Sequence, residues 1–226
     1  MWNQLLPDLT AFYTNCRLIN QFNANDLQYL DAAFHDIDTI WNKNFTKIEK
    51  VKYIMLSEAP LWGNLGKYIY NPIITNCSSF FWCSVLLYAL NQKGLIPTTN
   101  LKTNADLVDE LNNLGFLIVD VSPYALNTVN TSMNYPQLSH RQGNNYFNLI
   151  DPTLSVFFDD KLKKIIPKIP EEGVKIFYRY KRVENCLGNS INTRLSIYSL
   201  SILPPPLNNI SLQGGSIDKN KLAKII

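Results

Sequence analysis

Residues that build metal centres are scarce in this chain. Its 226 residues include two histidines, His35 and His140, and four cysteines, none of which forms a Cys-x-x-Cys pair. Zinc and iron–sulfur sites need closely spaced thiolates or imidazoles, so we expect no metal and no other cofactor. Widely scattered cysteines are typical of reduced, mostly buried thiols, which favours an intracellular protein, either cytoplasmic or in the nucleoid or nucleus.

Long apolar runs are lacking as well. No stretch of about 18 apolar residues occurs, so we expect no membrane-spanning segment and no membrane partner. The amino end, Met-Trp-Asn-Gln-Leu-Leu-Pro-Asp, has neither the basic region nor the apolar run of a signal peptide. Repeats, low-complexity segments and linkers are also lacking. This predicts a single domain over 1–226, in which a helical amino-terminal part, 1–50, packs on an α/β core, 51–226.

Charged residues are few, at 17%, whereas hydrophobic residues reach 46% and can form a sizeable core. The net charge is only +3, but it is unevenly distributed. Residues 1–110 carry 8 basic and 10 acidic side chains, and residues 111–226 carry 13 basic and 8 acidic. The basic excess between Lys161 and Arg182 is compatible with a nucleic-acid face. The alternative, which charge runs more often represent, is a solvated surface.

The stretch Val51–Pro60 is the most informative part of the chain. Tyr53, Ile54, Met55 and Leu56 form a short apolar run typical of a central parallel strand, expected at 52–57. Glu58 and Pro60 follow at the carboxyl end of this strand, which is the edge where open α/β sheets bind ligands. Glu58 is therefore the first candidate for a chemical role, and capping a loop or helix is the alternative.

Three further strands are expected, and they alternate with helices. Phe116–Val121 resembles the first strand, because it too ends in a carboxylate, Asp120, followed closely by a proline. The other strands are expected at 174–180 and 197–202, and 123–150 is expected to be a loop. Helices are expected at 2–22, 25–45, 78–91, 104–114, 159–166, 184–195 and 216–226, the last capped by Ser216. Such alternation predicts an α/β fold with a parallel sheet and helices on both faces.

Two segments resemble motifs of a known family. Ser57-Glu58-Ala59-Pro60 resembles the Gly-Glu-Ala-Pro-Gly motif of some branches of the uracil-DNA glycosylase superfamily. Residues 203–209, Leu-Pro-Pro-Pro-Leu-Asn-Asn, followed by Gly214-Gly215 and a last helix, resemble that superfamily's His-Pro-Ser-Pro-Leu loop. The resemblance spans about 51–226. It implies a three-layer α/β/α domain around a four-stranded parallel sheet.

The resemblance also implies roles for individual residues. Glu58 would position a water, Tyr70 (or Tyr68) would stack on a flipped-out base, Asp120 would read the base edge, and Leu207 would act as an apolar wedge. The remaining candidates are Ser57, Tyr124, Pro204 and Pro205 for the base or ligand, and Lys181, Arg182 and Asn208 for nucleic acid. The alternatives are structural: loop packing for the tyrosines, bonds to loop amides for Asp120, a rigid turn for the prolines, and a surface position for His140 and Arg141.

The sequence departs from the family's pattern where chemistry depends on it. Pro204 and Pro205 stand in place of a histidine and have no N–H to donate to an anionic base. Asp120 stands where an Asn is expected, and an ionised Asp only accepts hydrogen bonds. It would suit an amino or ring N–H edge and oppose an anionic uracil. Ser57 and Leu61 replace glycines, and the cysteine spacings of the family's iron–sulfur branches are missing.

The sequence therefore predicts a glycosylase-like protein that hydrolyses or binds a nucleobase in single- or double-stranded DNA, with uracil a poor substrate. Breaking a base–sugar bond develops an oxocarbenium-like sugar that a carboxylate can stabilise. The base must leave the stack, which a stacking aromatic and a wedge assist. Two alternatives stay open: a non-catalytic nucleic-acid binding protein on the same fold, and a pocket for a nucleotide or another small ligand.

Overall fold

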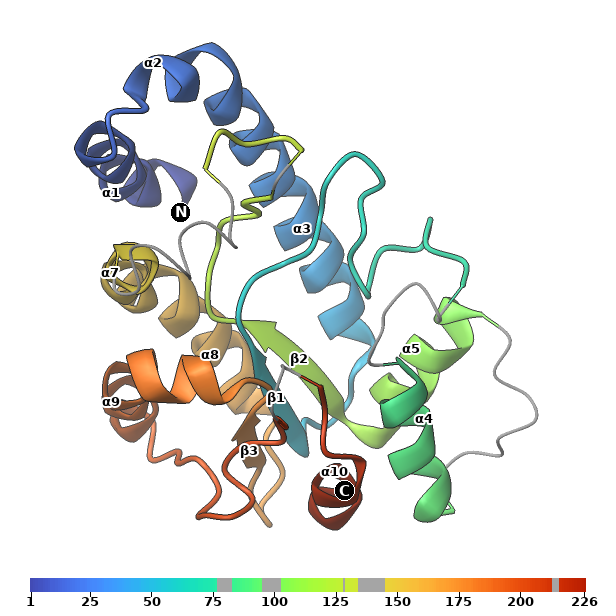
Figure 1. Cartoon of the computed structure of the whole chain (residues 1–226). Coiled ribbons are helices and arrows are strands. Elements are labelled where there is room, and N and C mark those ends of the chain that lie inside the picture. The colour runs from blue at the N-terminus through green and yellow to red at the C-terminus, as the bar shows by residue number, and fades with distance from the viewer. Residues whose placement is uncertain (77–82, 95–102, 128, 134–144, 213–215) are drawn as a thin grey trace.

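A computed structural model describes residues 1–76, 83–94, 103–127, 129–133, 145–212 and 216–226 (Figure 1). At its centre lies a parallel sheet in the order β2-β1-β3. The strands are β1 (Tyr53–Ser57), β2 (Phe116–Asp120) and β3 (Lys175–Tyr178). Because all three strands run in the same direction, their carboxyl ends lie at one edge. The predicted α/β class with a parallel sheet is confirmed.

Helices make up most of the remaining described chain. They are α1 (Trp2–Asn15), α2 (Ile19–Gln21), a π-helical turn (Phe22–Asp26), α3 (Leu27–Lys47), α4 (Cys83–Gln92), α5 (Asn104–Leu114), α7 (Asn145–Thr153), a second π-helical turn (Leu154–Phe158), α8 (Asp159–Ile165), a 3-10 turn (Ile166–Lys168), α9 (Lys181–Ile197) and α10 (Lys219–Ile225). None of these helices is long and apolar enough to cross a membrane.

One face of the sheet is covered by α4 and α10, which pack against each other. Tyr53 and Phe116 are paired in register and point to this face, where their rings stack at 6.1 Å. The Tyr53 hydroxyl donates to the carbonyl of Ile226, 3.0 Å away, and Lys175 Nζ donates to the carbonyl of Ile225. The carboxyl-terminal helix is thereby tied to the first and third strands.

The other face is covered by α3, α8 and α9 (Figure 1). The indole N–H of Trp41 in α3 donates to the Ile118 carbonyl of β2 at 3.1 Å. Arg194 of α9 pairs with Asp159 of α8, with 2.9 Å between Nη1 and Oδ2. Side chains alternate along a strand, so Val119, one residue after Ile118, faces α3 rather than α10.

Helix α5 forms over the predicted residues because both of its ends carry strong local signals. Thr103 accepts a hydrogen bond from the Asp106 N–H, and the Asp106 carboxylate accepts one from the Thr103 N–H, which completes a capping box. Gly115 ends the helix with φ at +72°, and a Cβ there would lie 2.1 Å from the Lys50 carbonyl oxygen. Only glycine fits this position.

The predicted fourth strand at 197–202 does not form a ladder. Helix α9 continues through Ile197, and this region contributes two isolated parallel bridges to β3, Ile176 with Ile202 and Tyr178 with Asn209. The prolines at 204–206 lie between the two bridges. Because proline has no N–H, this part of the segment cannot continue a hydrogen-bonded ladder.

Several other predicted boundaries are wrong. Residues 145–150, expected as part of a loop, belong to α7, and the first helix ends at Asn15, well before residue 22. The last helix begins at Lys219, not Ser216, because Asp218 accepts from the N–H groups of Asn220 and Lys221 and acts as its cap. His140, Arg141 and Gly214-Gly215 lie outside the described residues. Among the cysteines with described side chains, Cys16 is half-buried and Cys186 is exposed, so the prediction of mostly buried thiols is wrong for Cys186.

The amino-terminal helices are tied to the segment that follows β2. The buried carboxylate of Asp26 accepts from the Tyr13 hydroxyl at 2.8 Å and from the backbone N–H of Ser132 at 2.8 Å. The Tyr124 hydroxyl donates to the Leu5 carbonyl in α1 at 3.0 Å. These contacts hold residues 121–127 and 129–133, in the continuation of the strand that carries Asp120.

Candidate functional site

Two carboxylates and two arginines come together at the carboxyl edge of the sheet. Glu58 directly follows β1, Asp120 ends β2, Arg179 directly follows β3, and Arg182 lies in the first turn of α9. Glu58, Asp120 and Arg179 are 3%, 8% and 2% exposed. Charged groups are rarely buried without partners, so this cluster is the strongest candidate for a functional site in the described part of the chain.

Glu58 pairs with Arg182, whose Nη2 lies 2.5 Å from Oε1. The pair is asymmetric, because the Glu58 side chain is 4% exposed and that of Arg182 is 34% exposed. Burial raises the pKa of Glu58 to about 7, although Arg182 and Arg179 act in the opposite direction. At neutral pH the carboxyl group is therefore divided between its protonated and ionised forms. This is the state that general acid–base chemistry requires.

Asp120 is held by hydroxyl groups from two different segments. Ser57, opposite it in the register of β1 and β2, and Tyr68, in the loop after β1, both donate to its carboxylate. Burial raises the pKa of Asp120 to about 6, while the Ser57 hydrogen bond, the Lys161 ammonium and the Tyr68 hydrogen bond favour ionisation. At pH 7 most of Asp120 is ionised and accepts hydrogen bonds.

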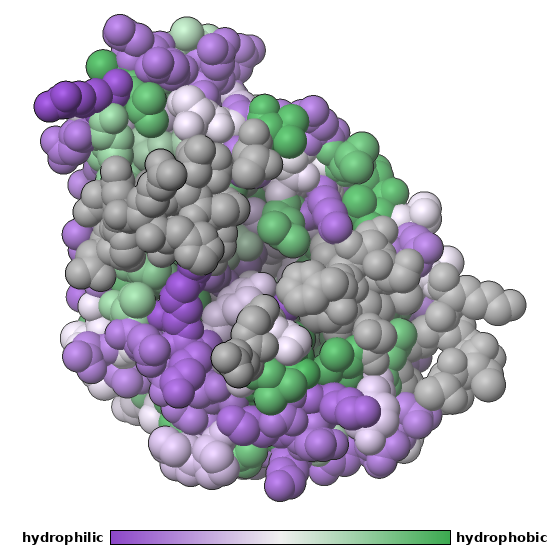
Figure 2. Space-filling model, viewed as in Figure 1, coloured by the Kyte–Doolittle hydropathy of each residue, from purple (hydrophilic) through white to green (hydrophobic). Residues whose placement is uncertain are grey.

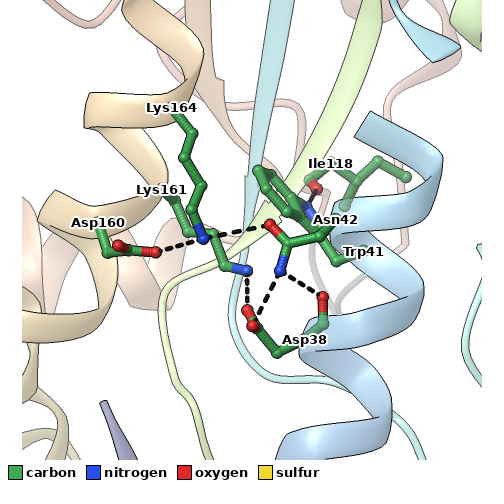
Figure 3. A network of polar contacts seen from close by, with 7 residues as sticks. All are labelled: Asp38, Trp41, Asn42, Ile118, Asp160, Lys161 and Lys164. Atoms are coloured by element: carbon green, nitrogen blue, oxygen red, sulfur yellow. Dashed lines mark hydrogen bonds and ion pairs between the residues drawn. The ribbon is translucent and has the colours of Figure 1, made fainter. Parts of the chain in front are cut away.

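A network of charged and polar side chains links α3 and α8 (Figure 3). Lys161 is 3% exposed, and its Nζ lies 2.5 Å from Asp38 Oδ1 and 3.9 Å from the centre of the Trp41 ring. Burial lowers the pKa of Lys161, whereas Asp38 raises it. One turn further along α8, Lys164 pairs with Asp160 at 2.7 Å and donates to the Asn42 side chain at 3.1 Å.

A small cavity separates this network from Asp120. Its lining includes Asp38, Trp41, Tyr68, Asp120 and Lys161. The centre of a water molecule can move within about 10 Å³ of this cavity. That volume is close to the minimum needed to hold one water. It is too small for a nucleobase, so a base could reach Asp120 only after nearby side chains move.

The two candidate stacking tyrosines have different surroundings. Tyr68 donates to Asp120 and belongs to the site, whereas the Tyr70 hydroxyl accepts from the backbone N–H of Ile118 at 2.8 Å. Tyr70 also lines a separate cavity of about 360 Å³ between α3 and α5. Both tyrosines are buried, and their rings meet edge-on at 5.7 Å. Of the two, Tyr68 is the one that the structure brings to the carboxylates.

The candidates near the last motif lie apart from this cluster. Pro204, Pro205 and Asn208 line a groove of about 670 Å³ against α9, which also includes Glu184. The Asn208 side chain donates to Glu184. Leu207 is half-buried against the core.

Two further candidates take part in backbone contacts. Tyr124 is buried and donates to Leu5, and the backbone N–H of exposed Lys181 donates to the Ser211 hydroxyl at 2.9 Å.

Sequence reasoning missed three members of the site. Lys161 and Arg179 were assigned to a basic surface, but both are buried, so neither the nucleic-acid face nor the solvated surface describes them. The apolar residues around Lys161, among them Phe157, Phe158 and Leu162, could have indicated a buried helix. Tyr146 of α7 was also missed. It is buried, and burial raises the pKa of its hydroxyl well above the usual range.

Exposed apolar side chains accompany the site. Leu61, Leu65 and Ile73, in the segment after Glu58, are 53%, 76% and 66% exposed. Figure 2 shows hydrophobic surface at the upper right of this view, over the part of the molecule that this segment occupies in Figure 1. The segment thus combines a buried carboxylate with an apolar outer surface.

Within the described ranges, no three His, Cys, Asp or Glu side chains are grouped so that they could hold a metal ion. No protein-family model, curated protein or solved structure matches the chain.

Proposed function

We propose that the chain is a divergent protein of the uracil-DNA glycosylase type, which hydrolyses or binds a nucleobase in DNA. The observation that supports this proposal most strongly is the burial of Glu58 and Asp120 at one strand edge, with pKa values of about 7 and 6. Perturbed carboxyl groups at the carboxyl edge of a parallel sheet are typical of a ligand or catalytic site.

Hydrolysis of a base–sugar bond suits these groups. The bond between C1′ of the sugar and the base nitrogen breaks, its electrons leave with the base, and water adds to C1′. Ionised Glu58 would orient this water, accept its proton and stabilise the cationic sugar. Arg182, partly exposed beside Glu58, offers a positive group for a nearby phosphate.

Asp120 would recognise the base. Because it accepts hydrogen bonds when ionised, it favours an edge with amino or ring N–H donors and disfavours uracil as a leaving anion. Tyr68, which donates to Asp120, is a better candidate for contact with the base than Tyr70.

The topology is compatible with a four-stranded, three-layer domain of this type. The segments around Ile202 and Asn209 run parallel to β3, on the side away from β1, where a fourth strand would lie. Helices α4 and α10 on one face and α3, α8 and α9 on the other provide the outer layers.

A second candidate is a non-catalytic binding protein on the same fold. It is favoured by the Arg182–Glu58 contact at 2.5 Å, which occupies an oxygen that catalysis needs. The small cavity beside Asp120 supports it as well, since a base does not fit there without movement.

Both candidates can be tested with single-stranded oligonucleotides that carry a panel of normal and damaged bases. Hydrolysis predicts release of a base with an amino-bearing edge, and Glu58→Gln should reduce the rate by at least about 100-fold. Asp159→Asn is a matched control, because Asp159 is also buried and paired with an arginine but lies between α8 and α9. Binding without cleavage of any oligonucleotide would favour the non-catalytic candidate. The absence of both binding and cleavage would contradict the proposal.

A further inference from the structure

Lys161 is a candidate for a residue that controls Asp120 from outside the strand edge. Its side chain comes from α8 and lines the same cavity of about 10 Å³ that Asp120 lines. The lysine is 3% exposed, so bulk water has little access to its charge. Buried charges interact more strongly than exposed ones because screening is weak.

The titratable groups around Asp120 come from several neighbouring elements, among them Tyr146 of α7 and Tyr180 after β3. Asp38 of α3 pairs with Lys161, and Asp160 and Lys164 of α8 pair with each other. Arg179, after β3, lowers the pKa of Asp120 as Lys161 does, while the Ser57 and Tyr68 hydroxyl groups are neutral hydrogen-bond donors to it. Lys161 is thus one of two buried cations that favour an ionised Asp120, and it is the one that shares the cavity.

We propose that Lys161 is a positioning residue that keeps Asp120 ionised, so that the site selects a nucleobase edge that carries an amino group. The selection of a base rests on the proposed function, whereas the link between Lys161 and Asp120 does not. Asp38 has the opposite effect, because it neutralises part of the Lys161 charge and adds a negative charge beside the same cavity.

This role differs from that of a structural lysine. The Lys161 Nζ lies 2.5 Å from Asp38 Oδ1 and 3.9 Å from the centre of the Trp41 ring. These two contacts would suffice to anchor a lysine between α3 and α8. An anchor of that kind would affect the stability of the fold but would leave the titration of Asp120 unchanged. The titration of Asp120 therefore separates the two roles.

The test is a carbon-13 NMR titration of the Asp120 carboxyl group in the full chain. Lys161→Met keeps an unbranched side chain but removes the positive charge. It should therefore raise the titration midpoint of Asp120 by about one pH unit or more. Asp38→Asn should lower it, because the mutation removes a negative charge and leaves the lysine unneutralised. Lys164→Met is the control: it lies on the same helix and also has an acidic partner, but it does not line the cavity, so the midpoint should stay unchanged.

The predicted order of midpoints, with Lys161→Met above and Asp38→Asn below the wild type, would support the proposal. Equal midpoints in the wild type and Asp38→Asn would overturn it, even if Lys161→Met failed to fold.

Base selection is measured separately, as the ratio of affinities for two oligonucleotides that are identical except at one position, which is cytosine in one and uracil in the other. Lys161→Met should bring this ratio towards one. If the midpoints follow the predicted order but the wild type binds neither oligonucleotide, the proposed function fails and the link between Lys161 and Asp120 stands.

Discussion

Ser57 and Asp120 lie opposite each other in the parallel pairing of β1 and β2, and the Ser57 hydroxyl donates to the Asp120 carboxylate. The bond joins the last residues of two neighbouring strands, directly before the chain leaves the sheet as Glu58 and Val121. The geometry of the strand edge thus sets both the position and the ionisation of Asp120.

Ser57→Ala should raise the pKa of Asp120 above its value of about 6, because the ionised form loses a donor. A hydrogen bond to a charged group contributes about 1.5–3 kcal/mol, which corresponds to a shift of roughly one to two pH units. A carbon-13 NMR titration of Asp120 measures it. Ser155→Ala, at an exposed serine, should leave the midpoint unchanged. An unchanged midpoint in Ser57→Ala would contradict the assigned bond.

Glu58→Gln should change the pH dependence of stability. The pKa of Glu58 rises from 4.5 to about 7 on folding, so the folded state binds a proton more tightly than the unfolded state. The wild type therefore loses stability as the pH rises from about 4.5 through 7, and Gln, which does not ionise, avoids this loss. Relative to the wild type, the variant should gain roughly 3 kcal/mol between pH 4.5 and pH 8.

Urea denaturation at a series of pH values measures this difference. Glu184→Gln provides the control, because Glu184 accepts hydrogen bonds from Asn208 and Asn209 near the surface instead of lying at the strand edge. A stability difference between Glu58→Gln and the wild type that stays constant with pH would show that Glu58 ionises in the folded protein as it does in the unfolded chain.

Tyr68→Phe and Tyr70→Phe should have different effects, although both remove one buried hydroxyl. Tyr70→Phe leaves the Ile118 N–H without its acceptor and should cost about 1–3 kcal/mol at any pH. Tyr68→Phe removes a donor to Asp120, so its cost should appear as the pH rises through about 6, where Asp120 ionises. Unfolding free energies at pH 5 and pH 8 separate the two. The same pH dependence in both variants would contradict this assignment.

Gly115→Ala should be among the most destabilising single substitutions in the described chain. Its Cβ would lie 2.1 Å from the Lys50 carbonyl oxygen, and its φ of +72° is strained for alanine. We expect a loss of roughly 3 kcal/mol or more. Gly173→Ala is the matched control, because it also has a positive φ but its Cβ would meet nothing within 4 Å. Equal losses in the two variants would contradict the steric explanation.

The elements predicted well from the sequence are those with strong local signals. Helix α5 has a capping box at one end and Gly115 at the other. Strands β1 and β2 are short apolar runs, with Glu58 directly after β1 and Asp120 at the end of β2. The same runs located Glu58 and Asp120. Local sequence sufficed here because the carboxyl ends of parallel strands meet at one edge.

The parts that could not be predicted depend on contacts between distant segments. The residues after Ile197 have strand-like composition, but α9 extends to Ile197 and the prolines interrupt pairing with β3. The neighbouring sequence places Lys161 on a basic surface, because its partner, Asp38, lies 123 residues earlier in the chain. Burial of a charge by a distant carboxylate and a tryptophan leaves no signal in the neighbouring sequence.

Recognition of the base by Asp120 is tested most directly by the affinities of the wild type and Asp120→Asn for two single-stranded oligonucleotides. The two are identical except at one position, which is cytosine in one and uracil in the other. The wild type should prefer cytosine, whose 4-amino group can donate to Asp120 where uracil presents a carbonyl oxygen, by about ten-fold or more, since a specific polar contact is worth about 1–3 kcal/mol. Asp120→Asn, which both donates and accepts, should lose this preference. Glu58-dependent excision of uracil by the wild type, or equal affinities in the wild type and the variant for both oligonucleotides, would contradict recognition of the base by Asp120.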